Sequence, residues 1–194
     1  MKSDKKTARP TPSANYATTH AELLLHEAMQ LVEAGELEQA LKRLTKESSC
    51  SPDVLNARGV CLLRLGRTAD AIRVLRSFVL APGCTCMRPE LPVIYRANFA
   101  TSLLLGGLAL GVRYTLAEFA EKDHPSVVRL RDAMRRWEQG LSWWQRLGWR
   151  CGLAPAVPIA IDFVPGEFVD PRATPVGAPP SPKAPQPAAL RQAA

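Results

Sequence analysis

The chain repeats a pattern of small and apolar residues at an interval of 31 residues. The first copy consists of Ala28, Leu31, Gly35, Ala40 and Leu44, and the second of Gly59, Leu62, Gly66, Ala71 and Leu75. Small residues are needed where two helices touch, and glycine is favoured where the chain turns after a helix. A unit of this length that recurs along a chain is typical of solenoid proteins. Because such proteins usually act through a surface, the pattern favours a binding protein over an enzyme.

The spacing of apolar residues predicts helices joined by tight turns. Thr19 and Glu22 have the spacing of a capping box, so the first helix is expected over residues 19–33. A second helix is expected to begin at Glu36, and Ser51 followed by Pro52 predicts the start of a third. A fourth is expected to end at Pro82. These four helices would form two antiparallel pairs.

A third, weaker copy of the unit begins near Asn98 and turns at Gly106 and Gly107. It follows the second copy by 41 residues because residues 84–91 are inserted. Residues 97–112 carry no charge, but a membrane-spanning helix usually needs about 20 apolar residues. We therefore expect a buried helical hairpin here.

The two clear units resemble the tetratricopeptide repeat, over residues 21–121 at most. That motif is marked by a small residue in the first helix, a glycine before the turn, an alanine in the second helix and a closing proline. The first unit supplies Ala28, Gly35, Ala40 and Pro52, and the second supplies Gly59, Gly66, Ala71 and Pro82. The aromatic residues of the motif's first helix are replaced by leucines. The expected fold is all-α, a right-handed α-solenoid of about three antiparallel helix pairs with a long C-terminal capping helix.

Composition divides the chain into five expected regions. They are a disordered basic tail (1–17), helical repeats (18–121), an amphipathic capping helix (122–151), an extended strap (152–164) and a disordered tail rich in proline and alanine (165–194). Val157, Ile159, Ile161 and Phe163 alternate with other residues, which suits an extended chain with one apolar face. We expect this strap to lie against the capping helix and to end at Pro165 and Gly166.

The resemblance implies a concave groove lined by the first helix of each unit, which would bind a protein or peptide. The candidate groove residues are Glu22, Leu25, Met29, Val32, Asp53, Asn56, Val60, Leu63, Arg64, Thr101 and Leu104. Family members that grip a C-terminal carboxylate use basic and amide side chains at positions that here hold Leu25, Met29, Ala57, Ile94 and Asn98. An apolar or helical peptide is therefore the expected ligand. Alternatively, the groove is filled by the protein's own C-terminal segment or by a second copy.

A basic, tryptophan-rich helix is expected over residues 125–151, where six arginines oppose two acidic residues. Its candidate surface residues are Arg129, Arg135, Arg136, Arg146, Arg150, Trp143 and Trp149. Such a helix can simply pack on the third unit, with Trp137 and Trp144 inside and its arginines in solvent. It can also lie on an anionic membrane surface, or hold the phosphates of a nucleic acid. The net charge of +7 fits both of these alternatives.

The sequence shows no pattern that predicts catalysis, a metal site or a cofactor. His20 and His26 lack the spacing of a helical zinc site, and no phosphate-binding loop or nucleophile motif stands out. Cys84 and Cys86 are separated by one residue, so a metal or redox role for them is left open. Five cysteines, an odd number, and a polar beginning of the chain favour reduced thiols in the cytoplasm.

Overall fold

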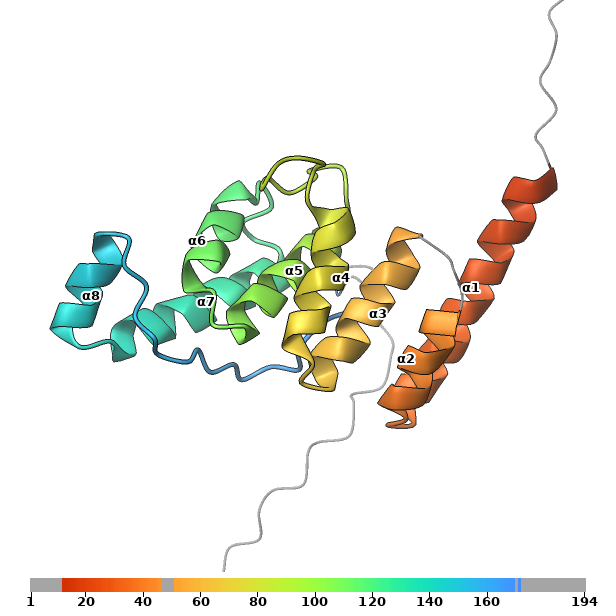
Figure 1. Cartoon of the computed structure of the whole chain (residues 1–194), viewed down its shortest axis with the longest axis horizontal. Coiled ribbons are helices and arrows are strands. Elements are labelled where there is room, and N and C mark those ends of the chain that lie inside the picture. Colours follow the sequence, from red (N-terminus) through yellow and green to blue (C-terminus); the bar gives the residue numbers. More distant parts are fainter. Residues whose placement is uncertain (1–11, 47–50, 170, 172–194) are drawn as a thin grey trace, which may run out of the picture.

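The computed structural model describes residues 12–46, 51–169 and 171, with side chains from His20 onward. This part of the chain is all-α, as expected, and consists of eight helices (Figure 1). The helices are α1 (Pro12–Glu33), α2 (Leu37–Lys46), α3 (Pro52–Arg64), α4 (Thr68–Val79), α5 (Val93–Leu105), α6 (Ala109–Glu118), α7 (Pro125–Gly140) and α8 (Trp143–Arg150). The chain forms an elongated row of helices, with α1 and α2 at one end and α8 at the other (Figure 1).

Three turns of the same geometry join α1 to α2, α3 to α4 and α5 to α6. Each turn has a glycine with positive φ, at Gly35 (82°), Gly66 (72°) and Gly107 (71°). In each, the amide after the glycine bonds back to a carbonyl five residues earlier: Glu36 to Leu31 (2.8 Å), Arg67 to Leu62 (2.9 Å) and Leu108 to Leu103 (2.9 Å). This is the Schellman arrangement, in which glycine adopts at little cost a conformation that strains other residues.

The small residues of the repeat lie where helices touch. A Cβ atom on Gly59 would lie 2.6 Å from the Leu75 side chain, so α3 and α4 approach too closely for a larger residue. Ala28 of α1 and Ala40 of α2 are fully buried. Beyond these pairs, α1 also contacts α3, and α3 contacts α5. The first helices of the three pairs thus lie next to one another.

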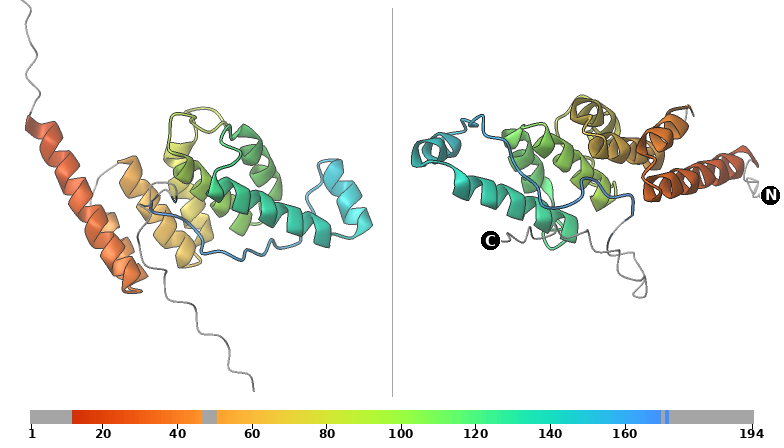
Figure 2. Two further views of the ribbon diagram at one scale, coloured as in Figure 1. Left: turned by 180° about the vertical axis from the view of Figure 1, so that it is seen from behind. Right: turned by 90° about the horizontal axis from the view of Figure 1, so that it is seen from below.

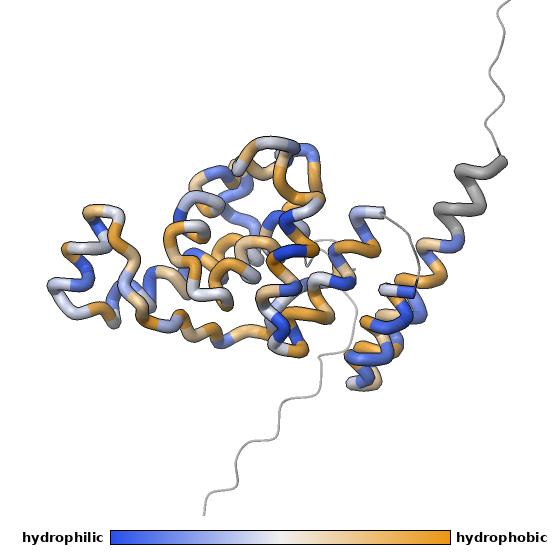
Figure 3. The backbone as a smooth tube through the Cα atoms, viewed as in Figure 1, coloured by the Kyte–Doolittle hydropathy of each residue, from blue (hydrophilic) through white to orange (hydrophobic). Residues whose placement is uncertain are grey.

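The uncharged stretch 97–112 forms the expected hairpin of α5, Gly106 and Gly107, and α6. Every residue from Ile94 to Leu104 is buried within the protein. Figure 3 shows hydrophobic residues gathered in the middle of the molecule, where α3, α4 and α5 meet. Within the described residues, none of the helices combines the length and the hydropathy that a membrane crossing requires.

Two of the predicted helices have other bounds than expected. The first helix begins at Pro12, not at Thr19, so it includes six residues of the predicted tail 1–17; proline suits a first helical turn because its missing amide has no partner there in any case. The predicted capping helix 122–151 is two helices. Leu141 is extended (φ −71°, ψ 142°), and Ser142 with Gln145 forms a capping box that starts α8.

This break changes which tryptophans are buried. Trp144, expected on the apolar stripe, is 67% exposed, whereas Trp149, expected at the surface, is 3% exposed. Because α8 turns back, the Trp149 ring meets Trp137 edge-on with centroids 5.2 Å apart. The Trp149 indole also donates to the Glu138 carboxylate at 2.8 Å.

After α8 the chain runs back along α7 as an extended segment (Figure 2). The Trp137 indole donates to the Val157 carbonyl at 3.0 Å, and Ile159 is buried. Every second side chain, from Val157 to Phe163, is more buried than its neighbours. The segment does not end at Pro165 and Gly166, because Glu167 and Phe168 continue to contact the helices; the predicted tail beyond residue 171 lies outside the described residues.

Candidate functional site

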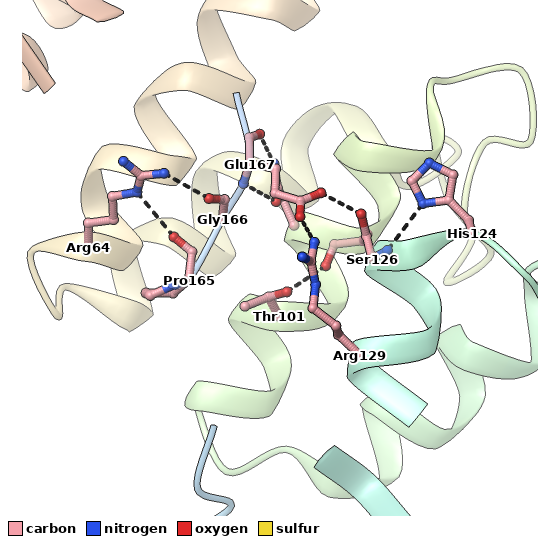
Figure 4. A network of polar contacts seen from close by, with 10 residues as sticks. Arg64, Thr101, His124, Ser126, Arg129, Pro165, Gly166 and Glu167 are labelled. Carbon is pink, nitrogen blue, oxygen red and sulfur yellow. Dashed lines mark hydrogen bonds and ion pairs between the residues drawn. The ribbon is translucent and has the colours of Figure 1, made fainter. Parts of the chain in front are cut away.

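The first helices α1, α3 and α5 form one face of the molecule, and residues 163–169 cross it. We call this stretch the C-terminal segment. It contacts α3 through Asn56 and α5 through Asn98. Arg64 of α3 also bonds to it, at the Gly166 carbonyl (Figure 4). The face on which the sequence predicts a groove is thus crossed by the chain itself. One of the alternatives from the sequence was that the protein's own C-terminal segment fills this groove.

Asn98 recognises the main chain of the C-terminal segment. Its amide group donates to the Glu167 carbonyl at 2.8 Å, and its oxygen accepts the Glu167 N–H at 2.9 Å. The Asn98 amide also donates to the Asn56 oxygen at 2.8 Å, and the Asn56 amide reaches the same Glu167 carbonyl at 3.4 Å. Both asparagines are 2% exposed. This pairing holds an extended chain whatever its side chain at this position, because both bonds go to backbone atoms.

The Glu167 side chain adds a contact that depends on charge. Its carboxylate forms an ion pair with Arg129 and accepts a hydrogen bond from the Ser126 hydroxyl (Figure 4). Ser126 lies in the first turn of α7, where unpaired amides and the helix dipole favour a negative charge. His124, the buried N-cap, accepts from the Ser126 amide at 3.3 Å. A carboxylate therefore fits this position better than a neutral or basic side chain.

Gly166 and Phe168 fix the chain on either side of Glu167. Gly166 has a positive φ of 79°, and a Cβ atom there would lie 3.0 Å from the Val60 side chain. Arg64 donates to the Gly166 carbonyl at 3.1 Å, and its guanidinium lies 5.0 Å from the centroid of the Phe168 ring. Burial lowers the pKa of the Arg64 guanidinium, because desolvation disfavours its charged form.

The candidate groove residues fall into three groups. Asn56, Val60 and Arg64 lie beneath or beside the C-terminal segment. The buried residues Leu63, Leu104 and Thr101 were predicted to line an open groove, but they are at most 4% exposed. The Thr101 hydroxyl donates a hydrogen bond to the Ala97 carbonyl one helical turn earlier, a common bond within helices. These three side chains are therefore closed to a partner in this arrangement.

The third group lies at the open edge of the face. Leu25, Met29 and Val32 of α1 are half-buried, Glu22 is exposed, and exposed Asp53 accepts a hydrogen bond from Tyr95. Burial raises the pKa of the Tyr95 hydroxyl well above its ordinary value. A cavity of about 500 Å³ separates α1 from the C-terminal segment, and Met29 and Val32 line it.

Several residues of this site were absent from the candidate set. Asn98 was noted only as the one polar residue among the carboxylate-binding positions, and Ser126, Glu167 and Phe168 were not proposed. A buried asparagine in the apolar helix α5 is a usable signal, because a polar group there needs a partner. Glu167 carries no comparable signal, since it lies 69 residues from Asn98 in an otherwise featureless stretch.

The arginines predicted for the basic helix have different surroundings. Arg136 pairs with Asp162 at 2.6 Å and Arg135 with Asp132 at 2.8 Å, so both are partly neutralised. Arg146 donates to the carbonyls of Gln139 and Leu141, and Arg150 is exposed. Trp143 is 63% exposed, and its ring stacks on that of Trp144 with centroids 3.7 Å apart.

The four cysteines that the structure describes are free thiols. In the described part of the chain, no three histidine, cysteine or acidic side chains are grouped so that they could hold a metal ion. Cys84 and Cys86 are exposed free thiols, and the Cys86 amide donates to the Cys84 sulfur at 3.2 Å. Hydrogen bonds from Cys86 lower the pKa of the Cys84 thiol. Burial raises the pKa of the Cys61 thiol to about 11, which makes this thiol unreactive.

Comparison with known proteins identifies no relative. No protein family model matches the chain, and neither a curated protein nor a solved structure matches it significantly.

Proposed function

We propose that this protein is a non-enzymatic interaction scaffold, built as a short α-solenoid similar to tetratricopeptide repeats. Its α1–α3–α5 face binds an extended peptide in which an acidic residue lies between a small residue and an aromatic one. In the free protein the C-terminal segment occupies this site, so a partner has to displace it. The partner is a protein that presents such a sequence.

The observation that carries this proposal is the double hydrogen bond between Asn98 and the main chain of Glu167. Because that contact does not depend on which chain supplies the peptide, a partner with the same sequence can make it equally well. Arg129 and Ser126 select an acidic side chain, and Arg64 selects an aromatic one that follows it. The solenoid assignment is supported by the repeated turns at Gly35, Gly66 and Gly107 and by the contacts among α1, α3 and α5.

The proposal is tested with a labelled peptide that has the sequence of residues 161–171. The full chain carrying Gly166→Val keeps every groove residue but should disfavour binding of its own segment, because valine is strained at this positive φ and its Cβ would lie only 3.0 Å from the Val60 side chain. We expect this variant to bind the peptide at least tenfold more tightly than the wild type in fluorescence anisotropy. A second change, Asn98→Ala, should abolish binding, and a peptide carrying Glu167→Lys should not bind.

Partner capture from cells provides the functional test. Gly166→Val should retain more partner than the wild type, and Gly166→Val with Asn98→Ala should retain none. Substituting Leu63 is unsuitable here, because that side chain is 2% exposed and a charge there would unfold the protein. Val32 of α1 is only half-buried, so Val32→Glu is used instead to test whether the open edge of the face contacts the partner. If the peptide binds equally to the wild type, to Gly166→Val and to Gly166→Val with Asn98→Ala, the proposed site is wrong.

A further inference from the structure

A second cavity, of about 470 Å³, lies at the opposite end of the molecule, between α6, α7 and α8. Four arginines line it: Arg113 from α6, Arg135 from α7, and Arg146 and Arg150 from α8. The cavity also contains the Glu138 carboxylate, which accepts the Trp149 indole N–H. Positive charge therefore predominates in this cavity.

The described residues neutralise only part of this charge. Arg135 pairs with Asp132 at 2.8 Å. The other three arginines have no carboxylate partner among the residues that the structure describes: Arg113 and Arg146 donate only to backbone carbonyls, and Arg150 is exposed. Four guanidinium groups around one cavity outnumber its single carboxylate, Glu138, and this excess of donors fits phosphate, which accepts several such bonds at once.

The outward face of α8, next to this cavity, is apolar. Trp143, Trp144 and Leu147 are 63%, 67% and 46% exposed, and Leu153, just after the helix, is 69% exposed. Residues three or four apart are neighbours on a helix, so the row of Arg146 and Arg150 runs beside the row of Trp143 and Leu147. Trp149, on the inward side, is buried. The helix thus exposes large apolar side chains beside its arginines, and an exposed apolar patch of this kind is typical of a contact surface.

We propose that the α8 end of the molecule binds the surface of an anionic phospholipid bilayer. A lipid phosphate enters the arginine-lined cavity, and Trp143, Trp144 and Leu147 enter the boundary between headgroups and acyl chains. Tryptophan favours this boundary and arginine is attracted to anionic lipids, so one surface satisfies both rows of α8. Aliphatic Leu147 and Leu153 fit acyl chains better than nucleic acid, whose bases stack on aromatic rings. This inference is independent of the proposed peptide site.

Cosedimentation of the full chain with vesicles tests this inference. We expect binding to phosphatidylcholine vesicles that contain phosphatidylserine and little binding to phosphatidylcholine alone. Arg150→Glu should weaken binding at least tenfold, as should Trp143→Ala combined with Trp144→Ala. Arg76→Glu on α4 makes the same change of net charge away from α8 and is the matched control (Figure 1). High salt should weaken the interaction, because the arginines are close to solvent.

Tryptophan fluorescence gives a second readout that a charge effect alone would not change. Trp137 and Trp149 are already buried, so a blue shift on vesicle binding reports Trp143 and Trp144 entering the lipid. The inference is overturned if the wild type does not bind anionic vesicles at low salt, or if Arg76→Glu weakens binding as much as Arg150→Glu. Binding without a blue shift, saturation by glycerophosphoserine alone, or tighter binding to single-stranded RNA also overturns it.

Discussion

The arginines beneath the C-terminal segment and those around α8 differ in how the fold treats their charge. Arg129 and Arg136 of α7 pair with Glu167 and Asp162, carboxylates that the returning chain brings to them. Arg146 and Arg150 of α8 receive no carboxylate among the described residues. The tryptophans differ in the same way, since Trp137 is buried and bonded to Val157 of the returning chain, whereas Trp144 is exposed. Basic and aromatic side chains are therefore paired and buried within the fold in one region and exposed in the other.

The largest expected difference between the two regions is in their tryptophans. Trp137→Ala should lower the free energy of unfolding by about 3–5 kcal/mol, because it removes a buried ring and the donor to Val157. Trp144→Ala should change it by less than about 0.5 kcal/mol, because that ring is exposed. Urea unfolding measures both values. Equal losses would show that α8 contributes to the core as much as α7 does.

The next effect concerns the ion pairs. Glu167→Gln should cost about 1–2 kcal/mol, because the Glu167 carboxylate is 21% exposed and holds both Arg129 and Ser126. Asp132→Asn, which breaks the exposed pair with Arg135, should cost less than about 0.5 kcal/mol. Thermal unfolding at two salt concentrations checks both. A larger loss for Asp132→Asn would contradict the view that the segment is what neutralises this part of α7.

Glycines distinguish the repeated turns from α7. Gly66→Ala should destabilise by about 1 kcal/mol, because its positive φ is unfavourable for alanine although the space around it is open. Gly140→Ala, at the end of α7 and also in open space, should be neutral or stabilising by about 0.5 kcal/mol. Denaturant titration of both variants separates backbone conformation from packing.

The smallest expected effect is on pH dependence. A hydrogen bond from buried Arg96 lowers the pKa of Glu121 below its ordinary value. Its contribution to stability is therefore complete above the ordinary glutamate pKa and is lost as the pH falls through the lowered value. Glu121→Gln should flatten the dependence of the melting temperature on pH in the acid range. Glu38→Gln, on the exposed side of α2, is the control. If the melting temperature of Glu121→Gln falls at acid pH as it does in the wild type, protonation of Glu121 does not weaken the fold through its pair with Arg96.

Local sequence was sufficient wherever contacts are short in range. Gly35, Gly66 and the small residues Ala28 and Gly59 identify turns and close helix contacts, because helix periodicity and glycine conformation act within one unit. The alternation from Val157 to Phe163 likewise indicates an extended chain. The start of α1 and the break at Leu141 were missed, since a helix can begin at an earlier proline or stop between two apolar residues without disturbing the apolar spacing.

The candidate site was only partly predictable. Asn56 and Arg64 were proposed from the expected groove, but their ligand was not, because Glu167 is 111 residues from Asn56 in the chain. The arginines of residues 125–151 could be counted from the sequence, whereas their partners could not. Which tryptophan is covered, Trp149 or Trp144, depended on the direction in which α8 leaves α7.

The amino-acid sequence by itself determined that this protein is helical, that its helices pair through glycine turns, and that its basic and aromatic residues concentrate near the end of the helical region. Periodicity, turn conformation and composition are local properties, so they can be read along the chain. Only the tertiary structure decided that the C-terminal segment binds α3 and α5 and that the described residues offer the α8 arginines no carboxylate partner. Those outcomes depend on contacts between residues far apart in sequence, whose formation depends on the packing of the whole chain.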